Sequence, residues 1–112
     1  MIYNTFDIVV VPFPFVDKKA TKKRPAIVLS SHEQFNKEAK ASILAMITSA
    51  LDNPWPHDVL IQDTQTCGLM VPCCIRMKIF TLDHRLILKK IGKLSLKDQK
   101  ALQHSLKQLL PR

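Results

Sequence analysis

Short runs of apolar residues, separated by prolines and polar turns, recur along most of the chain. Residues 6–11 form a β-branched run that Pro12 and Pro14 bring to an end, which is typical of a strand followed by a turn. The short apolar run at residues 26–30 suits a strand in the core. The further strands that this pattern predicts cover residues 42–49 and 58–62, one or two strands within 69–76 and 79–82, and an extended segment over 86–91.

Two helices are predicted from a different periodicity. Ser31 can cap a brief helix over residues 32–38. A longer helix follows Ser95, which with Asp98 three residues later resembles a capping box, and Pro111 ends it. The apolar residues that share one face of this helix are Leu102, Leu106, Leu109 and Leu110.

Short strands followed by an amphipathic helix predict an α+β fold that is mainly β. At 112 residues the chain has room for one domain with one modest core, spanning residues 1–112. The expected architecture is a small, strongly bent antiparallel sheet or barrel with a helix packed on it.

The charge of the chain narrows the choice of partner. Seventeen Lys and Arg residues against nine Asp and Glu give a formal net charge of +8. Such a field favours polyanions, nucleic acid among them, although it can also simply keep a small protein soluble. The longest apolar run is interrupted by Pro12 and Pro14, and Asp7 lies where a secretory signal would carry basic residues. We therefore expect a cytoplasmic protein with no membrane association.

Neither the cysteines nor the histidines have the spacing of a metal site. Cys67, Cys73 and Cys74 are an odd set without a C-x-x-C motif, and adjacent residues in a strand point to opposite faces. We expect all three to be reduced and buried. The histidines are scattered and no close carboxylate pair occurs, which disfavours a two-metal nuclease. No metal and no cofactor are predicted; the four histidines are His32, His57, His84 and His104.

Without a metal, cleavage of a phosphodiester would have to rest on arginine, on hydroxyl groups and on the 2′-OH of RNA itself. That hydroxyl is an internal nucleophile, so a protein need only orient it and stabilise the charge on the non-bridging oxygens. The planar fork of an arginine suits this task, and Arg24 lies next to the rigid Pro25. The alternative is a solvated basic loop. The cations of this loop are Lys18, Lys19, Lys22, Lys23 and Arg24.

Three other residues each allow two interpretations. Thr48 and Ser49 end an otherwise apolar strand, where their hydroxyls can bind a phosphate or the 2′-OH, or can bond to backbone at the turn. Trp55, between two prolines, can stack on a base or cover the edge of the core.

An ordered set of segments resembles the MazF/PemK-type toxins and spans nearly the whole chain. The set begins with FDIVVVPFPF at residues 6–15 and KRPAIVLS at residues 23–30. It continues through FN (35–36), ITS (47–49), CGL (67–69), IR (75–76), KIFTLD (78–83) and IGKLS (91–95). The resemblance implies an SH3-like barrel of the CcdB/MazF type and a homodimer with a groove for single-stranded RNA across its interface. It also implies a type II toxin–antitoxin system in which the toxin is a sequence-specific endoribonuclease, leaving a 2′,3′-cyclic phosphate and a 5′-hydroxyl.

The resemblance also assigns roles to residues. Arg24 falls on the catalytic arginine of the motif and Thr48 on its catalytic threonine, with Ser49 in support. Arg76 and Lys78 lie near the strand that lines the RNA groove in relatives. The implied inhibitor is an acidic antitoxin that folds on binding, in a complex that binds DNA.

Two departures and two alternatives accompany this interpretation. Phe6 replaces the usual glycine before the first aspartate, and the loop before Arg24 is rich in lysine and free of glycine, which makes it stiffer. A gyrase poison of the CcdB type would need a helix tip of aromatic and small residues, whereas this chain ends LLPR. A catalytically inactive RNA-binding module is disfavoured because both Arg24 and Thr48 are present.

Overall fold

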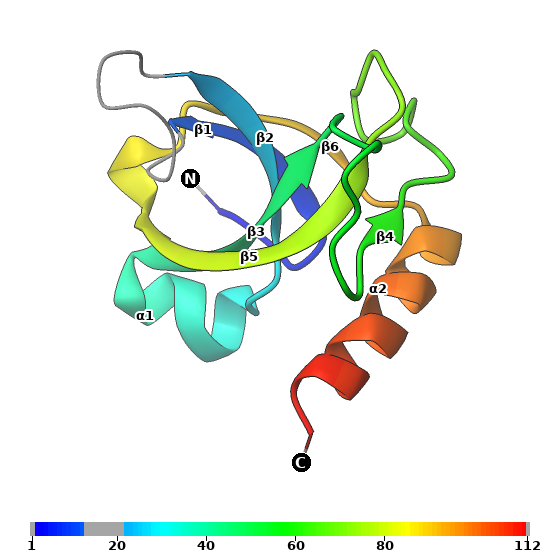
Figure 1. Ribbon diagram of the computed structural model, residues 1–112. Helices are drawn as coiled ribbons and strands as arrows, with labels where there is room; N and C mark the ends of the chain where they lie inside the picture. Colours follow the sequence, from blue (N-terminus) through cyan, green and yellow to red (C-terminus); the bar gives the residue numbers. More distant parts are fainter. Residues whose placement is uncertain (1, 13–21, 112) are drawn as a thin grey trace.

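The computed structural model describes residues 2–12 and 22–111 and contains an antiparallel sheet that curls into a half-barrel (Figure 1). Its six strands lie in the order β4-β5-β3-β2-β1-β6. The predicted fold, mainly β with a C-terminal helix, is confirmed. The strands are β1 (Asp7–Pro12), β2 (Lys23–Val28), β3 (Ala41–Thr48), β4 (Val59–Leu60), β5 (Cys74–Asp83) and β6 (Lys89–Lys93).

The strands differ from the prediction mainly in the second half of the chain. β4 has only two residues, and residues 69–73 belong to a loop instead of a strand. β5 is one continuous strand because it pairs with β3 along its whole length, with an irregularity opposite Ala45 and Met46. A short helical turn, η2 (His84–Leu86), is capped by Asp83, whose carboxylate accepts a bond from Arg85 N at 2.8 Å.

The helical segment predicted after β2 is present as η1 (His32–Asn36) and α1 (Lys37–Ala39). Ser31 Oγ accepts from Gln34 N at 3.2 Å, as expected of a cap. The buried Asn36 side chain donates to the Tyr3 carbonyl at 2.9 Å, which ties this segment to the N-terminal one.

The central strands are buried on both faces. Successive side chains of a strand point to opposite sides, so β1, β2 and β3 appear in the sequence as continuous apolar runs. One face packs against the C-terminal helix through Ile8, Ile27, Ile47, Leu94 and Leu102; the other packs within the half-barrel through Tyr3, Val9, Val11, Val28 and Leu44. Polar side chains are consequently displaced to the strand ends.

The C-terminal helix α2 (Leu96–Leu109) lies beside β4 (Figure 1). Ser95 Oγ accepts from Asp98 N at 3.3 Å, which is one half of the predicted capping box. The Asp98 carboxylate is 1% exposed and accepts from Gln62 N and Asp63 N at 3.0 Å each. Asp98 therefore also anchors the loop that follows β4, which the sequence pattern did not reveal.

The three cysteines are buried and free, as predicted. Burial raises the pKa of all three thiols, that of Cys67 to about 11. No helix in the described part of the chain has the length and apolarity needed to cross a membrane.

The two glycines of the chain lie where the loop before β5 contacts β6: Gly68 belongs to the loop and Gly92 to the strand. Gly68 has a φ of +74°, a conformation that glycine adopts without steric cost. A β-carbon at Gly92 would lie 2.5 Å from the carbonyl carbon of Cys67, and one at Gly68 would lie 2.4 Å from the Ile91 oxygen. This contact holds the loop before β5 directly on β6.

We predict that Gly92→Ala lowers the free energy of unfolding by about 1–3 kcal/mol, because the added methyl group must displace backbone atoms. Urea unfolding of the purified protein measures this change. The matched control is Lys93→Ala at the neighbouring exposed position, expected to stay within about 0.5 kcal/mol of the parent. Equal unfolding midpoints for Gly92→Ala and the parent would show that the backbone contact is looser than described.

Candidate active site

The pairing of β2 with β3 brings the predicted arginine and threonine together. Ala26 lies opposite Met46 and Val28 opposite Leu44 in this antiparallel ladder. The ladder ends at the Ala26–Met46 pair, and its register extended by two residues would set Arg24 opposite Thr48. Residues that face each other across an antiparallel pair project from the same face of the sheet. The two side chains therefore project from the same face at one end of the sheet, although 24 positions separate them in the sequence.

Both residues line one cleft of about 410 Å³ at this end of the strands. Of the predicted site residues, Lys22, Lys23 and Ser49 line it as well. Lys18 and Lys19 lie outside the described residues. The apolar wall comes from the loop before β5; the remaining lining residues are Pro25, Ile47, Leu69, Met70, Val71 and Cys73.

Arg24 has hydrogen-bonding capacity left unused. Its Nε is buried and has no hydrogen-bond partner among the residues that the structure describes. A buried donor without an acceptor costs free energy, and a phosphate oxygen entering the cleft would remove that cost. The side chain is half-buried, so solvent and ligands can still reach it.

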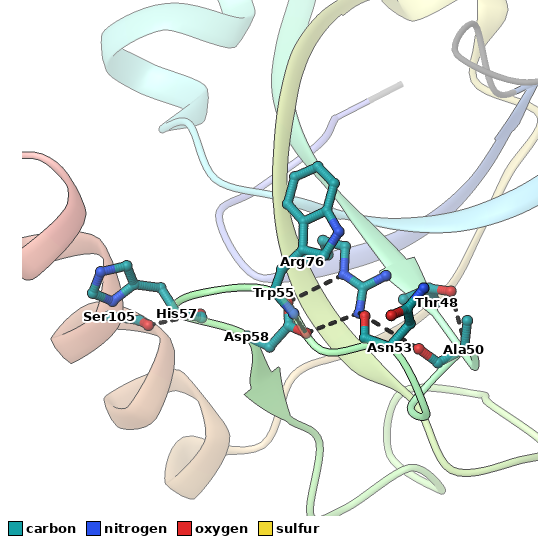
Figure 2. Close-up of polar contacts among 8 residues, drawn as sticks. All are labelled: Thr48, Ala50, Asn53, Trp55, His57, Asp58, Arg76 and Ser105. Carbon is teal, nitrogen blue, oxygen red and sulfur yellow. Dashed lines mark hydrogen bonds and ion pairs between the residues drawn. The ribbon is translucent and has the colours of Figure 1, made fainter.

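Thr48 is 4% exposed, and its Oγ1 accepts a bond from Ala50 N at 3.1 Å (Figure 2). The backbone interaction expected at a strand-to-turn junction is thus present. A hydroxyl group has one proton to donate and two acceptor positions. The bond from Ala50 orients the oxygen and leaves the proton available for a ligand in the cleft. Ser49, the next residue, is exposed.

Arg76 is buried, 6% exposed, and its guanidinium is engaged by one loop, residues 50–58. Nε and one terminal nitrogen donate to the two carboxylate oxygens of Asp58 at 3.2 and 2.9 Å. The same terminal nitrogen reaches the carbonyl oxygens of Asn53 at 3.1 Å and Ala50 at 3.5 Å (Figure 2). The residue predicted to bind RNA therefore has its fork occupied by a carboxylate.

Asp58 is the partner that sequence reasoning missed. Burial raises the pKa of its carboxyl. Hydrogen bonds from Arg76 and from the Trp55 N–H, together with the charge of Arg76, lower the pKa by more than burial raises it. The net pKa therefore lies below its usual value. Asp58 was assigned to a predicted strand, and nothing in its spacing from Arg76 indicated a pair.

Trp55 and Lys78 lie next to this ion pair instead of in the Arg24–Thr48 cleft. The indole is 42% exposed, with Lys78 Nζ 5.2 Å and Arg76 Cζ 5.5 Å from its ring centroid. Both separations are within the range of a cation–π contact. Trp55 therefore presents an aromatic surface to solvent beside a cation.

A second cleft, of about 790 Å³, lies at the other end of β3. Its polar centre is His84, whose Nε2 is 2.8 Å from Ser42 Oγ, and burial lowers the pKa of this imidazole. Lys37, Lys40 and Arg85 also line it. The sequence predicted no role for this set. Within residues 2–12 and 22–111, no three or more His, Cys, Asp or Glu side chains come together as a metal site.

Comparison with known proteins gives a family match and structural neighbours. Residues 4–110 match the family described as the PemK-like, MazF-like toxin of type II toxin–antitoxin systems. No curated protein matches the sequence. MazF (Form-I) from Deinococcus radiodurans has a TM-score of 0.77 at 18% identity, over 100% of this chain and 99% of that one.

Two mycobacterial structures are also similar. The toxin MazF-mt6 of Mycobacterium tuberculosis has a TM-score of 0.71 at 17% identity, over 91% of this chain and 93% of that one. An endoribonuclease in complex with its cognate antitoxin, from Mycobacterial species, has a TM-score of 0.73 at 11% identity, over 96% and 92%. At these identities the similarity shows a shared fold.

Proposed function

The chain belongs to the PemK-like, MazF-like toxin family of type II toxin–antitoxin systems, and from this membership we propose that it is an endoribonuclease that cuts single-stranded RNA at a short sequence without a metal. One observation carries the proposal. Arg24, with a buried donor that lacks a partner among the described residues, and Thr48, with a hydroxyl proton to donate, line the same cleft. A guanidinium can stabilise the charge that develops on the phosphate when the 2′-OH attacks it, and a hydroxyl can hold the reacting groups in place.

The reaction we propose uses the substrate's own nucleophile. The 2′-oxygen attacks phosphorus and loses its proton, the bond from phosphorus to the 5′-oxygen breaks, and the departing 5′-oxygen takes up a proton. The products are a 2′,3′-cyclic phosphate and a 5′-hydroxyl. Arg24 stabilises the charge on the non-bridging oxygens, and Thr48 fixes the scissile phosphate or the 2′-OH. Ser49, exposed at the end of β3, supports the same group.

The rest of the substrate is held mainly by charge. Lys22 and Lys23 line the cleft, and we propose that they bind the RNA backbone together with Lys18, Lys19 and Lys78. Trp55, with 42% of its surface exposed, is the proposed stacking platform for a base.

The proposed partners are a second copy of the chain and an acidic antitoxin, all in the cytoplasm. The net charge of +8 favours an acidic inhibitor. The structurally similar mycobacterial endoribonuclease is in complex with its cognate antitoxin. Sedimentation of the pure protein should give twice the chain mass, and the product of the neighbouring gene should be recovered with it. A monomer at micromolar concentration, or recovery of no partner, would contradict this assembly.

We predict that Arg24→Ala and Thr48→Ala each lower the cleavage rate on a long RNA by about 10²–10³-fold, the usual loss for one transition-state donor. Cleavage by the parent should persist in EDTA and leave the two end groups named above, which end-group analysis measures. Arg85→Ala and Thr81→Ala, at exposed positions outside this cleft, are the matched controls and should cut at the parental rate.

Three results would reject the assignment: parental rates for both site variants, a strict metal requirement, or RNA binding without cleavage. The last would indicate an inactive RNA-binding module. Incubation with gyrase and DNA tests the remaining alternative, since trapped DNA breaks would indicate a gyrase poison.

We predict that affinity for a cleavage-resistant 2′-O-methyl RNA falls with salt, with a slope of about −0.7 for each phosphate neutralised. Lys23→Ala should make this slope shallower by about 0.7, because it removes one cation from the cleft. Lys100→Ala on the exposed face of α2 should leave it unchanged. Fluorescence anisotropy over a salt series measures both, and an affinity independent of salt would mean that the positive surface is incidental.

A further inference from the structure

Every hydrogen bond that the Arg76 guanidinium donates goes to the loop of residues 50–58. Its fork binds Asp58 in the bidentate geometry that a phosphate would need, and the same terminal nitrogen reaches the carbonyl of Asn53 at 3.1 Å. With its Nε edge occupied and 6% of the residue exposed, Arg76 could bind a phosphate through that edge only after the ion pair with Asp58 had broken. Leaving a buried carboxylate unpaired is costly, so the pair should persist when RNA binds.

A short chain of contacts links Arg76 to the Thr48 hydroxyl. Ala50 is the connecting residue: its N–H donates to Thr48 Oγ1 at 3.1 Å, and its carbonyl accepts from Arg76 at 3.5 Å. Arg76 also lies opposite Met46 in the β3–β5 ladder, and Met46 is two residues before Thr48 in β3. The guanidinium thus holds the chain where it leaves β3, which is where the hydroxyl receives its orientation.

The same ion pair fixes the proposed base platform. Asp58 Oδ2 accepts from Trp55 N at 2.8 Å, and Arg76 Cζ lies 5.5 Å from the centroid of the Trp55 ring. The end of the loop has a separate anchor, because Ser105 Oγ of α2 donates to the carbonyl of His57 at 2.9 Å (Figure 2). Weakening the ion pair should therefore loosen residues 50–56 without detaching the loop from the fold.

We propose that Arg76 and Asp58 are positioning residues that hold the loop after β3, and through it Thr48 and Trp55, in the geometry needed for cleavage, and that Arg76 does not itself bind RNA. The proposal rests on the proposed endoribonuclease function. It assigns to Asp58 a role in turnover, and it gives Arg76 a role different from the RNA contact that the resemblance implies.

Two conservative variants separate positioning from RNA contact. Asp58→Asn removes a negative charge beside the site, so charge alone would tighten RNA binding and leave kcat unchanged. Positioning predicts instead that kcat falls about tenfold to a hundredfold while KM changes little, because a displacement of about 1 Å can cost that much. Arg76→Lys keeps the positive charge but loses the fork, and the same fall in kcat is expected. The double variant should be little worse than either single one, because the two residues act as a unit.

The matched controls are Asp83→Asn and Arg85→Lys, the same substitutions in an aspartate–arginine pair whose side chains are 40% and 89% exposed. Both should cut RNA with parental kcat and KM. All variants are assayed well below their thermal midpoints, with affinity for 2′-O-methyl RNA measured in parallel. Backbone amide shifts of Thr48 and Ala50, measured by NMR, should move in Asp58→Asn and stay in Asp83→Asn.

Parental kcat for Asp58→Asn and Arg76→Lys would overturn the positioning role. A loss confined to RNA affinity in Arg76→Lys would do so as well, and would restore Arg76 as an RNA contact. If the parent itself does not cut RNA, the proposed function fails instead, so the two failures are distinguishable.

Discussion

Strand β3 pairs with β2 on one side and with β5 on the other, and these two registers determine which polar side chains meet. Ala26, Met46 and Arg76 stand in one row across the three strands. Two residues further toward the end of β3, the same face of the sheet carries Arg24 and Thr48. Because the side-chain period of a strand is two, a slip of one residue between β2 and β3 would turn Arg24 and Ala26 away from Thr48 and Met46, and a slip between β3 and β5 would turn Arg76 away from Met46. The apolar packing on both faces prevents that slip, so the core and the cleft depend on the same alignment.

Burial on both sides of the central strands also determines which polar groups can be present. The buried side chains of Asp98, Asn36 and Arg76 each have partners that tie two segments of the chain together. Arg24 Nε differs, because it is buried and has no partner in the described part of the chain. Buried polar groups in proteins are almost always paired, so an unpaired buried donor in the cleft supports the proposed role of Arg24 in binding a ligand.

Much of the fold could be predicted from the sequence, because apolar runs, prolines and the Ser95 cap are local signals. The strand predicted over residues 69–76 begins only at Cys74, because Gly68 adopts a left-handed conformation and residues 67–68 contact β6, an interaction that no local pattern records. Of the site, spacing alone gave only a basic loop and two hydroxyls; the resemblance supplied the pairing of Arg24 with Thr48. The bond between Arg76 and Asp58 was missed, since a side-chain pair formed across a fold has no sequence period.

The residues of the proposed site lie in two kinds of segment, strands and a connection between strands. Arg24 and Thr48 lie inside hydrogen-bonded strands, whereas Trp55 lies in the connection from β3 to β4. Insertions and substitutions are tolerated far more readily in connections than in a ladder. Such changes can therefore accumulate around Trp55 without altering the strands that carry Arg24 and Thr48. Under the proposed function, a lineage built on this frame could acquire new target preferences and keep its chemistry, because selection would act on the two through different parts of the chain.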